Sequence, residues 1–177
     1  MEAQSEPAVL LSAETAPFDF ESLFHAQYGQ IARVINRILG DPAKAEDLSV
    51  EVFCKLLQTP RAHGPSVNGW LYRTAVRKAL DELRSQSRRH KYEGLFSRSQ
   101  ITSTEHAESA ADRQDRVRTT LAALDKRCAE ILVLRGEGFS YQNIAEALRL
   151  NPSSVGTLLS RAQEDFRKEY INRYGKP

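Results

Sequence analysis

Hydrophobic side chains recur at three- and four-residue steps along most of the chain, which is the spacing of an amphipathic helix. The first such run covers residues 20–38, and Gly40 follows it at a favourable C-terminal capping position. Asp41-Pro42 supplies an N-cap and a first-turn proline for a second helix reaching about residue 57. Residues 58–67 contain two prolines and a glycine and predict a loop, after which Asn68 is expected to cap a third helix to about residue 88.

The period is lost over residues 89–112, which are rich in Ser, Thr and charge, and it returns near Ala111. Helices are predicted from there to residue 124, from the Asp125 cap to Gly136, from the Ser140 cap over 141–148, and from Asn151-Pro152 to about residue 170. No alternating stretch indicates a strand. We therefore expect an all-α fold of two small helical domains, with three helices in residues 18–90, a flexible linker at 91–112 and four helices in 113–172. Residues 1–17 are expected to form a disordered acidic tail.

Charge is unevenly distributed, although the net charge is only +2. Residues 1–32 hold five acidic and no Lys or Arg side chains, and residues 73–98 hold eight basic against three acidic. Residues 99–115 are acidic again, with four acids and one base, and residues 116–177 hold eleven bases and seven acids. Two basic blocks favour two surfaces for a polyanion. On charge alone, solvated helix faces are the simpler interpretation.

Several classes of protein find no support in the sequence. Two cysteines cannot build a disulfide scaffold and suit a reduced, cytoplasmic compartment. The longest apolar runs are far shorter than the ~20 residues of a membrane helix, so no membrane insertion is expected. The four histidines lie in separate segments, and there is neither a phosphate-binding glycine loop nor a nucleophile elbow. We therefore expect no enzyme, metal, cofactor or small-molecule substrate.

Residues 140–162 have the spacing of a helix-turn-helix, in which the second helix enters the major groove of DNA. The first turns of that second helix offer side chains that can bond phosphates or bases: Ser153, Ser154, Thr157, Ser160 and Arg161. A helical hairpin without any role in DNA binding fits the spacing equally well.

Two other faces carry candidate chemistry. In the third helix, Trp70 and Tyr72 lie beside four basic residues, a combination that suits single-stranded nucleic acid. Trp70 itself lies on the apolar stripe, so a core role is the simpler interpretation for it. The acidic face of the second helix, at Glu46, Asp47 and Glu51, is either solvated or a docking surface for a basic partner.

These residues resemble a known family. Ala45-Glu46-Asp47-Leu48 with Glu51-Val52-Phe53, followed by Trp70-Leu71-Tyr72-Arg73 and Ala79-Leu80-Asp81, resembles region 2 of bacterial RNA polymerase sigma factors. Ile131-Leu132-Val133-Leu134-Arg135, Gly138-Phe139-Ser140-Tyr141 and Ser154-Val155-Gly156-Thr157 resemble region 4. Their order and spacing are similar to the small extracytoplasmic-function (ECF) group.

The resemblance implies a sigma factor that binds core RNA polymerase and promoter DNA, as duplex and as opened single strand, with an anti-sigma factor as a further possible partner. Core polymerase would contact the second helix at Glu46, Asp47, Glu51 and Lys55. The −10 element would be opened and held by His63, Asn68, Trp70, Tyr72, Arg73, Arg77, Lys78 and Arg84. The −35 element would be read by Tyr141, Ser153, Ser154, Thr157, Ser160 and Arg161. The linker acids Glu105, Glu108 and Asp112 would mimic nucleic acid in the polymerase channel.

Two alternatives stay open at this point. One is a stand-alone helix-turn-helix regulator that binds duplex DNA without polymerase. The other is a sigma mimic that sequesters an anti-sigma protein.

Overall fold

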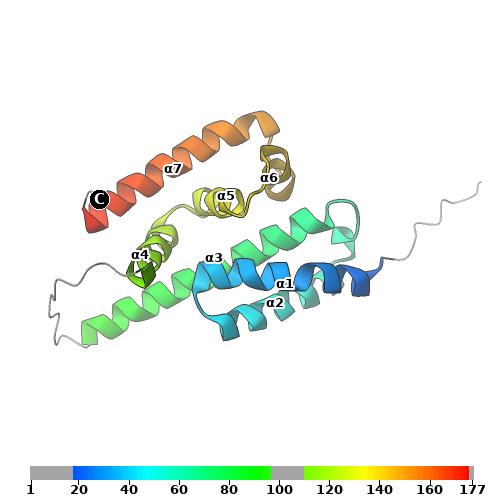
Figure 1. The fold of residues 1–177 in the computed structure, drawn as a ribbon, viewed down its shortest axis with the longest axis horizontal. Helices are drawn as coiled ribbons and strands as arrows, with labels where there is room; N and C mark the ends of the chain where they lie inside the picture. The colour runs from blue at the N-terminus through cyan, green and yellow to red at the C-terminus, as the bar shows by residue number, and fades with distance from the viewer. Residues whose placement is uncertain (1–17, 97–109, 176–177) are drawn as a thin grey trace, which may run out of the picture.

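The computed structural model describes residues 18–96 and 110–175, and its first half opens with two capped helices (Figure 1). Helix α1 spans Phe20–Leu39, with the Asp19 side chain accepting a hydrogen bond from the Ser22 amide at 3.0 Å. It ends at Gly40, whose φ of 72° is left-handed. Helix α2 spans Pro42–Leu57 and is capped by Asp41, as the sequence predicts.

Helix α3 is longer than the sequence indicates. It spans Val67–Phe96 and follows a short 3₁₀ turn at Pro60–Ala62. It therefore begins before Asn68, which is not its cap, and it continues eight residues beyond 88 into the predicted linker. The apolar period marks only the buried face of a helix, and no proline or glycine interrupts residues 89–93. The tail at 1–17, together with Glu105 and Glu108, lies outside the described residues.

Helices α1, α2 and α3 pack together as one bundle (Figure 1). Its interior is built from side chains of all three helices: Ile31, Ile35, Val52, Phe53, Leu56, Leu71, Ala75 and Leu80. Phe24 and Tyr28 extend this interior with aromatic contacts to Phe53, at centroid distances of 4.9 Å and 6.0 Å. Trp70 packs against the same core and is half-buried, as its place on the apolar stripe predicts.

The second half contains four helices, α4 (Ala110–Ala123), α5 (Lys126–Gly136), α6 (Tyr141–Leu148) and α7 (Pro152–Tyr174). The predicted caps Asp125, Ser140 and Asn151 each accept hydrogen bonds from backbone amides of the first turn of their helix. Helix α7 ends four residues later than predicted. Buried apolar side chains from α5, α6 and α7 form the second core: Ile131, Leu134, Ile144, Leu148, Val155, Leu159 and Ala162.

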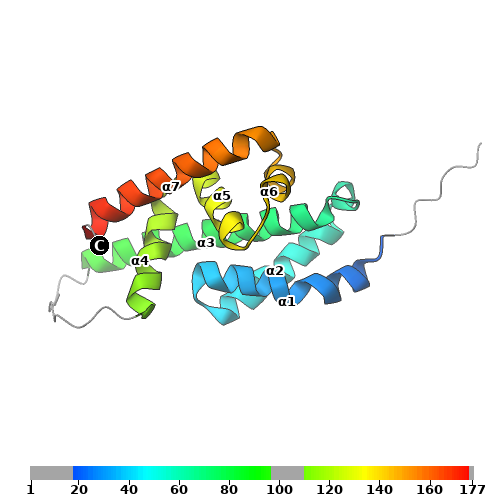
Figure 2. The same ribbon diagram turned by 45° about the horizontal axis from the view of Figure 1, so that its top comes forward.

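The two halves pack against each other along α3. Helices α1 and α2 lie on one side of α3, and α5 to α7 lie on the other in both views, while α4 crosses α3 in the view of Figure 2 (Figures 1 and 2). Residues 18–96 and 110–175 contain no strand, and the predicted all-α fold of two small helical domains is confirmed. Within these ranges no helix is both long and apolar enough to cross a membrane.

Candidate nucleic-acid interface

Helices α6 and α7 cross as a helix-turn-helix. Arg149 ends α6 in the left-handed region at φ 55°, and Asn151 caps α7 two residues later. The Tyr141 ring of α6 packs over Gly156 of α7, because a Cβ built there would lie 3.5 Å from Cε2 of the ring. Val155 and Leu159 face the interior. Most other positions in the first turns of α7 therefore face outward, whereas Leu158 packs partly against the core.

The residues predicted to read duplex DNA share one outer surface. Tyr141 is 46% exposed, and the α7 side chains are all exposed: Ser153, Ser154, Thr157, Ser160 and Arg161. The Ser153 hydroxyl donates to Oδ1 of Asn151 at 2.8 Å, and the Ser160 hydroxyl donates to the Gly156 carbonyl at 3.1 Å. The oxygen lone pairs of both hydroxyls stay available as acceptors. The fold thus brings this predicted set together at the start of α7.

Arg135 belongs to the same surface, although no motif or spacing predicts its place there. Its guanidinium lies 5.6 Å from the centre of the Tyr141 ring and donates to the Phe139 carbonyl at 3.0 Å. A cation on that aromatic face holds the ring in place and adds positive charge beside the exposed hydroxyls. The glycine turn between α5 and α6 creates this contact, so helical spacing could not predict it.

The residues predicted to hold the −10 strand do not form one open surface. Nε2 of His63 donates to the Leu56 carbonyl at 3.0 Å, and its ring stacks on Phe18 at 3.9 Å. Asn68 is exposed at the start of α3. Lys78 forms an ion pair with Glu51 of α2, one of the residues predicted to contact polymerase. Their role in holding the strand stays a prediction.

Four other members of that set contact the second half of the chain. Arg77 binds both carboxylate oxygens of Glu130 on α5, at 2.8 Å and 3.2 Å. Arg73 donates to the Ala147 carbonyl at 2.9 Å, and the Tyr72 ring meets Phe139 edge to face at 4.6 Å. Arg84 also donates to backbone carbonyls of the second half, those of Ala122 (3.3 Å) and Leu124 (3.2 Å).

This contact between the halves is close and partly dry. The Glu130 side chain is 2% exposed, and a Cβ on Gly69 would lie 3.3 Å from Cα of Ala147. Burial lowers the pKa of the Arg73 guanidinium, and the positive charges of Arg149 and Arg77 lower it further. Burial also raises the pKa of the Tyr72 hydroxyl. In this arrangement the side chains of Tyr72, Arg73, Arg77 and Arg84 all contact residues of the second half of the chain.

The outer face of α2 is exposed, as its predicted role requires. Glu46, Asp47, Glu51 and Lys55 all lie on the surface. Two apolar residues lie among them, Val50 at 49% and Leu57 at 52% exposure, although the helical period predicts Leu57 on the buried face. They are seven positions apart, or about two helical turns, so they share one stripe. Two apolar side chains within a charged, exposed face can supply apolar contact area to a protein partner.

The described ranges contain no group of three or more His, Cys, Asp or Glu side chains able to hold a metal ion.

Comparison with known protein families assigns this chain to a family. Residues 23–89 match the model of Sigma-70 region 2, and residues 114–164 match the model of Sigma-70 region 4. The two matches occur in the same order as the two helical halves and together cover about two thirds of the chain.

The chain belongs to the sigma-70 family of RNA polymerase sigma factors. Within it, three of the similar proteins carry ECF names. The ECF RNA polymerase sigma factor SigK of Mycobacterium sp. (strain JLS) is 22% identical over 156 residues, covering 84% of this chain and 79% of the relative. The RNA polymerase sigma-H factor of Pseudomonas aeruginosa is 28% identical over 163 residues, covering 84% of each chain.

A solved structure shares the fold of this sigma factor. It is the sigma factor RpoE from Bartonella quintana, crystallised in complex with the anti-sigma factor NepR. The TM-score is 0.50 at 22% identity, covering 85% of this chain and 96% of that one. Sigma factors are transcription initiation factors, so core RNA polymerase and promoter DNA are the partners of this chain. Below, region 2 denotes residues 23–89 and region 4 denotes residues 114–164.

Proposed function

We propose that this sigma factor directs promoter-specific initiation in the cytoplasm, with region 2 opening and holding the −10 element and region 4 reading the −35 element. The observation that carries the proposal is the outer surface of α7. It presents a helix N-terminus, hydroxyls at Ser154 and Thr157 and the cation Arg161 on one exposed face. This is the arrangement with which a recognition helix enters the major groove.

Core polymerase binds the outer face of α2 in this proposal. Val50 and Leu57 supply apolar area, while Asp47 and Glu51 supply charge for register and specificity. This face is exposed while the two regions are in contact, and α2 and helices α5 to α7 lie on opposite sides of α3 (Figure 2). Polymerase can therefore reach α2 before the two regions separate.

Binding of the −10 strand requires the two regions to separate. Arg77, Arg73 and Tyr72 contact Glu130, Ala147 and Phe139 in the arrangement described here. The same donors and the same ring face cannot bond region 4 and a DNA strand at once. We therefore include opening of this contact as a step between polymerase binding and strand capture.

Run-off transcription tests the function. Purified core polymerase is supplied with genomic fragments, with and without this protein, and transcripts are mapped by their 5′ ends. A shared pair of upstream elements in transcripts that depend on the protein would support the proposal. The absence of any dependent transcript would refute it. A tight, sequence-specific gel shift without polymerase would favour a stand-alone regulator instead.

An anti-sigma factor is proposed as a further partner because the RpoE neighbour was solved with one. The test is whether a candidate anti-sigma protein competes with core polymerase for this chain. Loss of anti-sigma binding to Val50→Asp, measured without polymerase, would place the anti-sigma protein on the α2 face. A partner whose binding leaves promoter-dependent transcription unchanged would fail this test.

A further inference from the structure

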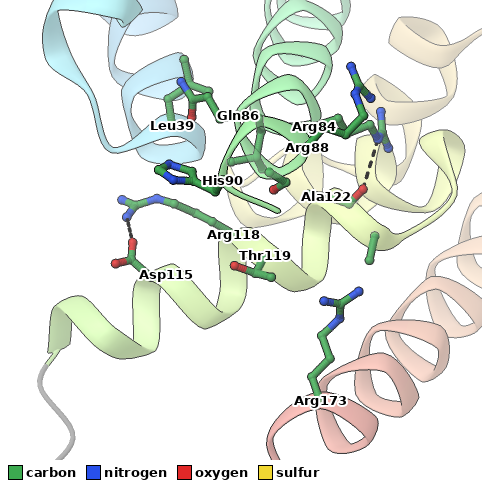
Figure 3. A pocket seen from close by; sticks show the side chains of 13 residues that line it. Leu39, Arg84, Gln86, Arg88, His90, Asp115, Arg118, Thr119, Ala122 and Arg173 are labelled. Atoms are coloured by element: carbon green, nitrogen blue, oxygen red, sulfur yellow. Dashed lines mark hydrogen bonds and ion pairs between the residues drawn. The ribbon is translucent and has the colours of Figure 1, made fainter. Parts of the chain in front are cut away.

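A cavity of about 780 Å³ lies between the two halves of the chain, where the end of α3 faces α4 and α7 (Figure 3). Its size falls in the range of sites that hold small ligands, roughly 300–1,000 Å³. Arginine side chains from both halves line it: Arg84 and Arg88 from α3, Arg118 from α4 and Arg173 from α7, and His90 of α3 lies among them. Among the described residues, Asp115 is the one carboxylate in this lining.

The arginines are held in different ways. Arg118 donates to Oδ1 of Asp115 at 2.8 Å, while its Nε is buried without a hydrogen-bond partner among the described residues. Its guanidinium lies over Gly40, where a Cβ would come within 2.5 Å of Cζ. The position of Arg118 is thus fixed, yet one of its donors is unused. Figure 3 shows Arg118 running beside His90, and Arg173 reaching up from α7.

Closing the two halves places like charges around one hollow. Arg88 is exposed and makes no hydrogen bond or ion pair within the described ranges, and Arg173 pairs only along its own helix, with Glu169. Like charges that share one hollow repel each other, although water weakens this repulsion where Arg88 is exposed. An anion that bonds to cations of both halves would remove this repulsion. Arginine suits a phosphate anion at this place, because its planar guanidinium binds phosphate through two parallel hydrogen bonds.

One wall of the cavity is apolar and is formed by Leu39, Leu83, Ala122 and Ala123. We propose that this cavity binds a polyphosphate anion, either inorganic or carried by a nucleotide, and that binding favours the closed arrangement of regions 2 and 4. The second part follows from linkage, since a ligand bonded to both halves binds the closed form better than the open one. This inference does not depend on the promoter contacts proposed above.

The experiment uses the full chain at fixed ionic strength. Calorimetric titrations are run with inorganic tripolyphosphate and with ATP, and sodium sulfate serves as the reference anion. Saturable binding of either polyphosphate, at least tenfold tighter than sulfate, would support the proposal. Tighter binding of ATP than of tripolyphosphate would identify a nucleotide as the source, and equal or weaker binding would identify the inorganic anion. Absence of saturable binding would overturn the proposal.

Three variants locate the site. Arg88→Gln and Arg173→Gln each remove one cation from the cavity and should weaken binding about tenfold or more. Arg167→Gln removes an exposed cation of α7 outside the cavity lining and should leave binding unchanged. Equal weakening by all three variants would show general attraction of anions and would refute a defined site.

The acidic segment that joins the two halves is the competing occupant. Glu105→Gln and Glu108→Gln are combined in one variant. If polyphosphate binds only to this double variant, the acidic segment is the occupant of the cavity and the proposal is overturned. Unchanged binding in that double variant would support it. For the closed form, saturating ligand should narrow the distribution of distances between spin labels on regions 2 and 4. A broader distribution would contradict the predicted stabilisation.

Discussion

Replacing Arg77 by methionine should shift this sigma factor from its closed arrangement towards an open one. Methionine keeps most of the apolar stem and removes the guanidinium that binds Glu130 through Nε and Nη2. The Glu130 carboxylate is 2% exposed, whereas the Arg77 side chain is 39% exposed. Removal of Arg77 therefore leaves a buried charge without its partner, while the arginine itself was partly hydrated.

The magnitude follows from this burial. Removing one partner of a buried ion pair costs about 3–5 kcal/mol. Because water reaches one side of this pair, we take the low end, about 3 kcal/mol. Arg77 belongs to region 2 and Glu130 to region 4. When the regions separate, water reaches the Glu130 carboxylate, so the open form does not carry the free-energy cost of a buried, unpaired charge. The ratio of closed to open molecules should then fall roughly 150-fold, the factor that corresponds to 3 kcal/mol.

The assay measures the distance between the two regions. Spin labels are attached at Cys54, which is exposed on α2, and at a cysteine that replaces Arg167 on α7. Cys128 is replaced by serine so that it cannot take a label. Pulsed dipolar spectroscopy should give one short distance for the parent and a broad, longer distribution for Arg77→Met. Lys78→Met is the matched control, because its ion pair with Glu51 stays inside region 2.

Two results together would refute the reasoning. If the variant stays closed, water cannot reach Glu130 and its carboxylate stays unpaired. The free energy of unfolding must then fall by about 3 kcal/mol, the cost of that unpaired carboxylate. A variant that keeps the parent's distance distribution and also its denaturant midpoint would show that the pair contributes nothing to closure. Opening of the Lys78→Met control to the same extent would show that general charge loss is responsible.

Three further predictions concern single side chains. If Arg161 contacts a phosphate, Arg161→Ala should reduce the slope of log affinity against log salt by about one. If Arg161 reads a base, the variant should lose about 1–3 kcal/mol of binding free energy, and this loss should depend on the DNA sequence. Gel shifts of the holoenzyme across a salt series separate the two cases, and no change in either quantity would remove Arg161 from the site. Leu57→Asp should weaken binding to core polymerase by tenfold or more in a pull-down titration. Because Leu57 is 52% exposed, the melting temperature should stay unchanged. Unchanged binding would exclude the Val50 and Leu57 stripe from the interface. Ser140→Ala removes the cap bond to the Asn143 amide and should lower the free energy of unfolding by about 1 kcal/mol in urea titration, and an unchanged midpoint would contradict that role.

Much of the fold was predictable because it is decided locally. Asp41, Ser140 and Asn151 cap their helices through contacts two or three residues away, and Gly40 ends α1 through its own backbone conformation. The end of α3 was not predictable from the apolar period. The period reports what a helix buries, and the end of α3 continues beyond the core of region 2.

The candidate sites were predictable to different extents for a related reason. The α7 surface follows from one helix and its cap, so the predicted side chains were found together. Val50 on α2 could have been selected as an apolar residue on an otherwise polar face, whereas the helical period assigns Leu57 to the buried face. Arg135 and Glu130 could not, because their partners Tyr141 and Arg77 are brought to them by a turn or by packing of the two halves.

The basic face of α3 illustrates a general limit of such predictions. Aromatic and basic side chains predict the chemistry of a partner, namely a flat ring and anionic or carbonyl oxygens, but not the molecule that supplies them. Here region 4 supplies all of these: the Phe139 ring for Tyr72, the Glu130 carboxylate for Arg77 and the Ala147 carbonyl for Arg73. Region 4 therefore occupies the groups that a single strand of DNA would use. Closure and strand capture must then compete for the same donors, and any change that weakens closure without touching those donors should favour strand capture.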